Sequence, residues 1–216
     1  MMKLLAVLFL ASLAHADKVI DINKQIDEGL KKANSILTAR GLGLHPVPDH
    51  KFDDLELKRG VHVGINSLQR SDDATLTIGE DGKVSVDIHV GWHLFETGYA
   101  LIKTQGLLFS GVVRVGDSSF RIAYDIVSKP ECKVSLSHLE YERLADAQFS
   151  GSLPETDRDI SDVFSQHVLP YFNEKFAKAK GHVERVMNEA ICRHPRGLVA
   201  SQNHITTIID ALGEFL

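Results

Sequence analysis

The spacing of apolar residues changes twice along this chain, and this pattern limits its possible folds more than any other feature. Near both ends, apolar residues recur every three or four positions, which is typical of amphipathic helices. Between residues 61 and 136 they recur at every second position, which is typical of strands that bury one face. The sequence therefore predicts an α+β fold in which an antiparallel sheet is covered by helices.

The first helix is predicted from Lys18 to Arg40. Gly41 and Gly43 follow it, and the prolines after them prevent its continuation. Its apolar positions form one narrow stripe, with lysine and aspartate opposite: Val19, Ile22, Ile26, Leu30, Ala33 and Leu37.

Alternating residues predict the strands of a meander. "GEDGK" (79–83) supplies one turn, and "GDSS" (116–119) is expected to supply another between two strands. Lys129-Pro130 breaks the chain before the next strand. Trp92 stands at a strand end, where it could line the mouth of a channel or pack at an edge, and edge packing is the favoured interpretation. The alternating positions are Val61, Val63, Ile65, Leu76, Ile78, Val84, Val86, Ile88, Val90, Phe120, Ile122, Tyr124, Ile126, Val134 and Leu136.

A second, much longer helix is predicted from about Asp159 to Arg193. Pro170 lies inside it and should kink it or open a turn. A strongly curved sheet wrapped around this helix is the economical way to bury both faces. A short amphipathic segment from Ile205 to Phe215 ends the chain. The apolar positions of the long helix are Ile160, Val163, Phe164, Val168, Phe172, Phe176, Ala179, Val183, Val186, Met187 and Ala190.

The N-terminus has the three parts of a secretory signal. A short basic start precedes the apolar run Leu4–Leu13, and Ala14-His15-Ala16 is a small-x-small cleavage pattern. The run is too short to span a bilayer, and no later segment is predicted to be transmembrane. We therefore expect residues 1–16 to be removed, and residues 17–216 to form a single secreted, extracellular domain.

The expected localisation determines the expected oxidation state of the two cysteines. In an oxidising compartment, an even cysteine count indicates a disulfide, so Cys132 and Cys192 are expected to be bonded. In the chain-entropy model, a loop of this size contributes roughly 4 kcal/mol to stability. The bond would join a strand to the long helix.

Charge and motifs argue against several functions. Without Lys3, the mature chain has 23 basic and 29 acidic side chains, a net charge of −6, and no basic run. It is therefore a poor partner for nucleic acid or an anionic membrane surface. "GDSS" superficially suggests a hydrolase serine, but no GxSxG elbow or glycine-rich phosphate loop occurs. We expect no enzymatic activity and no cofactor.

The eleven histidines do not form a recognisable metal site. His89 and His93 would lie about 13 Å apart on a strand, too far to share one ion. His182 and His194 have no third ligand in register, and no HExxH or CxxC pattern occurs. Solvated histidines at the edge of the core explain them better.

Several short motifs resemble the tubular lipid-binding superfamily. Members related to the bactericidal/permeability-increasing and airway-epithelium proteins bond a cysteine after a Lys-Pro turn to one late in a long helix. "SKPECKVSL" and "ERVMNEAICRH" occupy those places. "PVPDH" (46–50) followed by "VSVDIHVGWH" (84–93) is most similar to the group 7 mite allergens of arthropods. The bactericidal proteins have a basic tip, whereas this chain is acidic, which argues against an endotoxin-killing role.

Two non-enzymatic functions follow as expectations. In the first, a secreted protein holds a lipid-like ligand in an apolar channel between sheet and helices, although an aromatic helical stripe is also typical of plain core. In the second, an exposed apolar tip at Leu107, Leu108 and Phe109 contacts microbial lipids or lipopeptides in an innate-immune or surfactant role. The expected channel residues are Ile22, Ile26, Leu30, Val86, Ile88, Phe120, Ile122, Tyr124, Phe164, Val168, Phe172 and Phe176.

Overall fold

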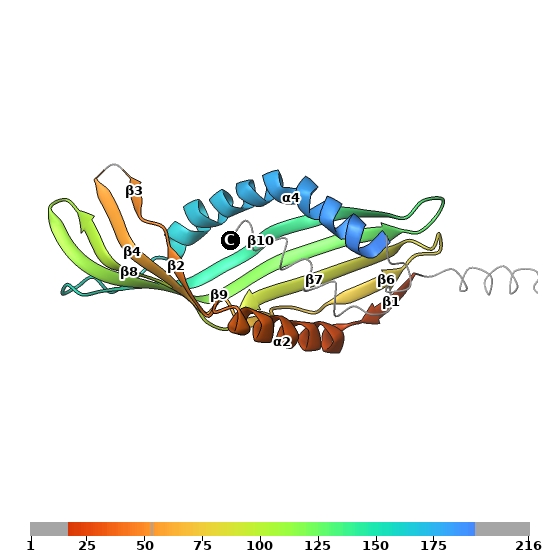
Figure 1. Ribbon diagram of the computed structural model, residues 1–216, viewed down its shortest axis with the longest axis horizontal. Coiled ribbons are helices and arrows are strands. Elements are labelled where there is room, and N and C mark those ends of the chain that lie inside the picture. The colour runs from red at the N-terminus through yellow and green to blue at the C-terminus, as the bar shows by residue number, and fades with distance from the viewer. Residues whose placement is uncertain (1–16, 53, 193–216) are drawn as a thin grey trace, which may run out of the picture.

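A computed structural model describes residues 17–52 and 54–192. The predicted signal (1–16), Arg193 and the segment Ile205–Phe215 lie outside these residues. The elements, in chain order, are β1 (Lys18–Asp21), α2 (Asn23–Ala39), β2 (Leu44–Val47), β3 (His50–Phe52), β4 (Leu55–Val63), β5 (Leu68–Arg70), β6 (Thr75–Ile78), β7 (Val84–Trp92), β8 (Phe95–Thr104), β9 (Leu107–Val127), β10 (Lys133–Gly151), β11 (Arg158–Asp159), α3 (Ser161–Val163), the π-helical turn η1 (Phe164–Val168) and α4 (Leu169–Cys192) (Figure 1).

All strands belong to one antiparallel sheet, and β9 and β10 form its spine. The two strands are 21 and 19 residues long, and β10 pairs with β9 from Lys133–Val127 to Gly151–Gly111. The second half of β9 also pairs with β7, whereas its first half pairs with β8. The sheet therefore has two ends, one built from β1, β5, β6 and β7, and a hairpin end built from β2, β3, β4 and β8. Figure 1 shows the hairpin end extending beyond α2 and α4.

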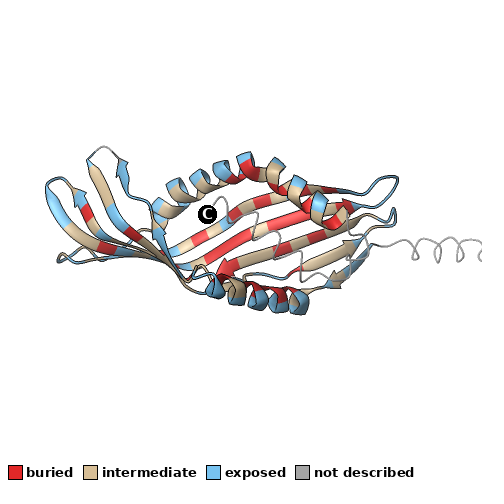
Figure 2. Ribbon diagram, in the orientation of Figure 1, coloured by how far each residue is buried: buried red, intermediate tan, exposed pale blue. Residues whose placement is uncertain are grey.

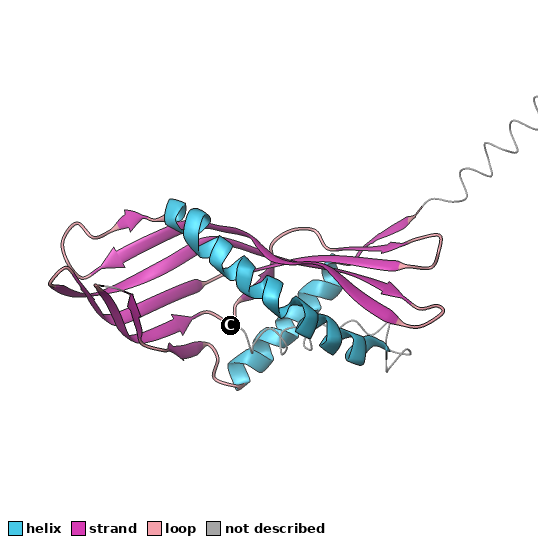
Figure 3. Ribbon diagram, turned by 90° about the horizontal axis from the view of Figure 1, so that it is seen from above, coloured by secondary structure: helices cyan, strands magenta, loops and turns pink. Residues whose placement is uncertain are grey.

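Pairing aligns apolar side chains in rows on one face, which we call the inner face. The rows are Val86–Tyr124–Leu136, Ile88–Ile122–Leu139 and Val90–Phe120–Tyr141. Irregular register in β10 between residues 136 and 138, and between 141 and 143, keeps the apolar residues on this face although their numbers change parity. Helices α2 and α4 lie along opposite borders of the inner face, with buried strand residues between them (Figures 1 and 2), and their axes cross when seen from above (Figure 3).

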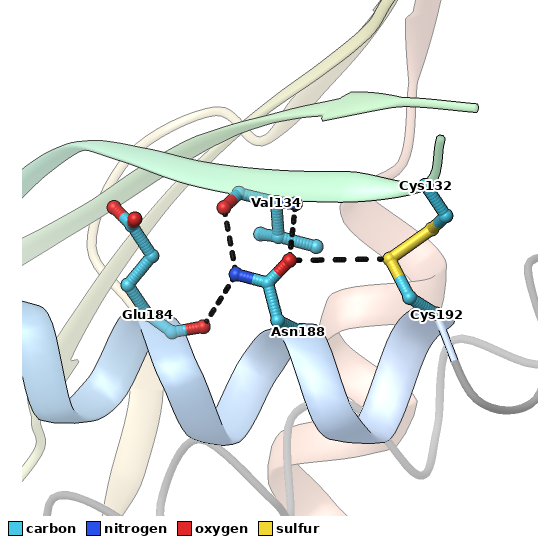
Figure 4. The surroundings of a disulfide bond; sticks show 5 residues. All are labelled: Cys132, Val134, Glu184, Asn188 and Cys192. Carbon is cyan, nitrogen blue, oxygen red and sulfur yellow. Dashed lines mark hydrogen bonds between the residues drawn. A yellow bond between two sulfur atoms is a disulfide. The ribbon is translucent and has the colours of Figure 1, made fainter. Parts of the chain in front are cut away.

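Helix α4 satisfies the free edge of β10 with side chains in place of another strand. Asn188 accepts a hydrogen bond from the Val134 N–H (2.7 Å) and donates to the Val134 carbonyl (2.9 Å) (Figure 4). Asn173 makes the same pair of bonds with Tyr141, at 2.7 and 2.9 Å. Because unpaired backbone groups at a buried edge are costly, these amides fix α4 in register on β10.

The disulfide predicted from the sequence is confirmed. Cys132 and Cys192 are bonded, with their Cα atoms 5.5 Å apart (Figure 4). Cys132 lies just before β10, and Cys192 is the last residue of α4. The bond therefore joins the sheet to the C-terminal helix.

The antiparallel sheet and the C-terminal helix are also confirmed, but the sheet is open and does not close around α4. The predicted start of the long helix was wrong, because Arg158 and Asp159 form β11 and helical structure begins at Ser161. The π-helical turn ends where the Leu169 N–H bonds to the Phe164 carbonyl, just before Pro170. A wide turn accommodates the proline ring, which would clash with the carbonyl four residues earlier in an α-helix.

The predicted helix from Lys18 to Arg40 was also wrong at its start. Lys18–Asp21 forms β1 and pairs with β6, and α2 is limited to Asn23–Ala39. Asp21 accepts the Asn23 N–H through its side chain (2.7 Å), which favours the change from strand to helix at this point. Backbone pairing of this segment with the edge of β6 outweighs the preference for helix that the spacing of Val19 and Ile22 indicates.

Two further predictions in the meander were wrong. "GDSS" does not form a turn, because β9 continues through it. Its serines are satisfied within the sheet: Ser118 Oγ accepts the Trp92 backbone N–H (2.9 Å), and Ser119 Oγ donates to Glu142 (3.0 Å). Trp92 does not pack at a sheet edge: it ends β7, where it pairs with Leu68 of β5, and its side chain is buried in the core.

Candidate functional site

Eight of the twelve expected channel residues lie in one buried apolar cluster, and the other four are partly buried and pack against it. From the sheet come Val86 and Ile88 of β7 and Phe120, Ile122 and Tyr124 of β9, all buried. These strands supply the floor between the helices because alternation directs every second side chain to the inner face. The cluster is the candidate site.

Helix α4 and the turn before it contribute one border of the cluster. Phe176 is buried, whereas Phe164, Val168 and Phe172 are only partly buried and pack against the cluster from its rim. The burial of the helical stripe predicted from sequence therefore decreases from Phe176 toward η1.

Helix α2 contributes the opposite border. Ile26 and Leu30 are buried in the cluster, and Ile22 is partly buried beside it. Asn34 holds the helix to β5: its amide donates to the Leu68 carbonyl (2.7 Å) and accepts the Leu68 N–H (2.8 Å). This is the same backbone-mimicking pair that α4 makes with β10.

Tyr141, which the sequence analysis missed, lies at the centre of the aromatic residues. Its ring centroid is 5.1 Å from that of Phe120, 5.5 Å from Phe176, 5.7 Å from Phe172 and 5.9 Å from Trp92. The register of β10 is irregular, so the apolar residues of this strand do not keep a strict period of two. Alternation therefore did not identify Tyr141 as a buried residue. Only the count of apolar residues in "LSHLEYERLADA" hinted at a buried strand.

The interior of the site is uncharged. Ser118 and Ser119 are the only buried polar side chains in residues 17–52 and 54–192, apart from the tyrosines and the tryptophan. Burial raises the pKa of Tyr124 to about 12, and it raises the pKa of Tyr141 further. A ligand here would meet apolar and aromatic surface.

The opposite face of the sheet carries polar side chains that are paired with one another. Glu142 accepts hydrogen bonds from Ser119 (3.0 Å) and lies 2.8 Å from His89 Nδ1, and Ser71 contacts Ser119 at 2.9 Å. Ser119 bonds to a carboxylate and not to an imidazole, so these residues do not form a Ser–His–Asp triad. The described part of the chain has no cluster of three or more metal-binding side chains.

Asp87 and Arg121 form a bidentate ion pair on this polar face, with two hydrogen bonds of 3.0 and 2.7 Å. Burial opposes ionisation of Asp87, but the bonds from Arg121 outweigh it and lower the pKa of the carboxyl group. Such a bidentate pair between neighbouring strands supports the sheet.

A polar groove between α2 and β5 is a weaker candidate. It is lined by Asp27, Lys31, Asn34 and Arg70, among others. Arg70 is already bonded to Asp27 (3.0 Å), and Asn34 is occupied by β5. The side chains of the groove that are best suited to bind a ligand are therefore already hydrogen-bonded within the protein.

The expected apolar tip lies at the turn of the β8–β9 hairpin. Leu107 and Leu108 are 55% and 61% exposed, whereas Phe109 is partly buried and packs edge-on against Phe149 (6.4 Å between centroids). Lys103 is the cross-strand partner of Leu108. Two of the three expected tip residues are therefore available to a partner.

No protein-family model matches the chain, and no curated protein shows significant similarity to it. None of the helices in the described ranges is long and apolar enough to cross a membrane. The function is therefore inferred from the site itself.

Proposed function

We propose that this protein is a secreted, non-enzymatic carrier that binds a lipid-like molecule on the inner face between α2 and α4. The observation that carries the proposal is the single apolar cluster that unites both helices with the sheet. The tubular arrangement, in which sheet and helices enclose a channel, belongs to this proposal.

Binding would rest on burial of alkyl surface. Each methylene removed from water contributes about 0.8 kcal/mol. The partly buried residues Phe164, Val168 and Phe172 line the rim of the site, where an entering alkyl chain would first meet apolar side chains. Apolar pockets with few polar groups are typical of sites for such ligands.

Native mass spectrometry of freshly purified protein tests the proposal, together with uptake of the fluorescent probe N-phenyl-1-naphthylamine. We expect added mass from a bound lipid, and probe fluorescence that a long-chain lipid displaces. A bare mass with no probe uptake would contradict the proposal.

A second candidate function is binding through the tip, favoured by the exposure of Leu107 and Leu108. A filled interior and an apolar tip would suit a surface-acting protein that contacts microbial lipids or lipopeptides. The long strands β8 and β9 hold this tip away from the helices (Figure 1).

Two variants with matched controls separate the candidates. Phe172→Trp adds bulk at the rim of the site, and Tyr171→Trp adds similar bulk on the exposed side of the same helix. Leu108→Asp places a charge on the tip, and Leu44→Asp places one on an exposed leucine elsewhere. A carrier loses affinity with Phe172→Trp alone; loss with Leu108→Asp alone would assign the function to the tip.

A further inference from the structure

The side chain of Trp92 contains a buried hydrogen-bond donor without an acceptor. The residue is only 7% exposed, and its indole Nε1–H has no hydrogen-bond partner among the described residues. Its backbone N–H, by contrast, is satisfied by Ser118 Oγ at 2.9 Å. Buried donors are almost always paired in native proteins, so an unpaired indole N–H requires an explanation.

Trp92 belongs to the same aromatic group as the proposed ligand site. Its ring centroid lies 5.3 Å from Phe95 and 5.9 Å from Tyr141. Tyr141 in turn contacts Phe172 and Phe176 of α4. The donor is therefore one ring away from the residues expected to hold the apolar part of a ligand.

The surroundings of Trp92 favour a neutral acceptor over an anion. In residues 17–52 and 54–192, no lysine, arginine or histidine side chain is fully buried. His62 is partly buried and stacks on Phe95 (5.8 Å between centroids), but burial lowers its pKa and so disfavours the cation that could compensate a carboxylate. Tyr141, the ring neighbour of Trp92, is itself buried, and burial raises the pKa of its hydroxyl because a negative charge is poorly solvated there. An uncharged carbonyl oxygen accepts a hydrogen bond without that penalty.

We propose that the ligand is an uncharged lipid with a carbonyl oxygen, such as a ketone, aldehyde or ester, which accepts the Trp92 indole N–H. This inference rests on the proposed carrier function and specifies the class of its ligand. The single polar contact would fix the position of the ligand along the site, while its alkyl chain is held by the aromatic residues.

The chain contains one tryptophan, so its indole N–H gives a single assignable signal in a ¹H–¹⁵N spectrum. We expect 2-hexadecanone to move the indole proton signal downfield, as an accepted hydrogen bond does. Hexadecane, of equal chain length, should leave the signal close to its position in the free protein. A signal that moves equally with both compounds, or with neither while both bind, would overturn the inference.

Displacement of N-phenyl-1-naphthylamine gives the corresponding affinities. We expect 2-hexadecanone to bind about tenfold more tightly than hexadecane, since hexadecane leaves the donor unpaired. Palmitic acid at neutral pH should bind more weakly than the ketone; tighter binding of the acid would overturn the preference for an uncharged ligand. Equal affinity of the ketone and hexadecane would remove this inference but leave the carrier function, whereas no displacement by any compound would contradict the carrier function.

A variant and its control test the role of the indole. Trp92→Phe removes the donor and should abolish the preference for ketone over hexadecane. Phe95→Leu removes packing beside the same ring but keeps the donor, so the preference should remain. If Trp92→Phe does not fold, the spectrum of the wild-type protein still decides the question.

Discussion

Asn188 and Asn173 replace a neighbouring strand along the free edge of β10. Each side-chain amide pairs with both the N–H and the carbonyl of one strand residue, as a backbone amide would. Asn34 does the same for β5. A polar residue on the inner side of an amphipathic helix is thus compatible with burial, because it satisfies two backbone groups at once.

We predict that Asn188→Leu lowers the free energy of unfolding by about 2 kcal/mol, since it leaves the Val134 N–H and carbonyl unpaired at a covered edge. Urea denaturation followed by circular dichroism measures the change. Glu174→Ala is the control, because Glu174 forms an exposed ion pair with Lys178 on the same helix and its loss should barely move the midpoint. Equal effects of the two substitutions would argue against the edge role of Asn188.

His62 links stability to pH. Burial, and then the proximity of His45, lower the pKa of His62 below 6.5. The unfolded chain therefore takes up this proton at higher pH than the folded protein, so stability is lost as the pH falls below about 6.5. The loss stops once the pH has passed the lowered pKa of His62.

Urea midpoints between pH 7.5 and pH 5 measure this loss. His62→Gln keeps a polar group beside Thr97, which lies 2.6 Å from His62 Nδ1, and should flatten this part of the pH dependence. A variant as sensitive as the wild type would show that other groups are responsible.

At the scale of elements, α4 is attached to the sheet at its end by a covalent bond. We predict that Cys132→Ala/Cys192→Ala lowers the melting temperature markedly, since the closed loop separates the cysteines by 60 positions and contributes roughly 4 kcal/mol. Lipid uptake should be partly retained, because Phe164, Val168 and Phe172 lie at the other end of the helical segment.

Differential scanning calorimetry and probe uptake measure the two properties of the double variant. An unchanged melting temperature would show that the side-chain bonds of α4 suffice to hold it. Complete loss of uptake in a folded double variant would show that the far end of α4 is needed for binding.

At the scale of the whole molecule, ligand binding should be visible as a change in local stability. We predict that saturating 2-hexadecanone raises the melting temperature, because a ligand at about 100 times its dissociation constant adds about 2.7 kcal/mol. Hydrogen exchange should slow in α2 and α4, which border the site, and remain unchanged at the β8–β9 turn. Protection at that turn alone would instead indicate the tip.

The sequence alone determined the features that depend on local periodicity and composition. Alternation identified β6 and β7 and the second half of β9, the helical spacing identified most of α4, and the even number of cysteines identified the disulfide. Of the twelve residues expected to line a channel, eight lie in one buried apolar cluster and four pack against it. Such patterns record which side of an element is buried, and that information is present in short stretches of chain.

Tertiary structure decided what depends on partners distant in sequence. Lys18–Asp21 is a strand because β6 offers a free edge, and "GDSS" continues a strand because Trp92 and Glu142 satisfy its serines. Tyr141 enters the core because β10 changes register. The physical reason is the same in each case. Backbone pairing and burial depend on contacts between segments that are distant in sequence, and these contacts outweigh the local preference of a segment for helix or turn.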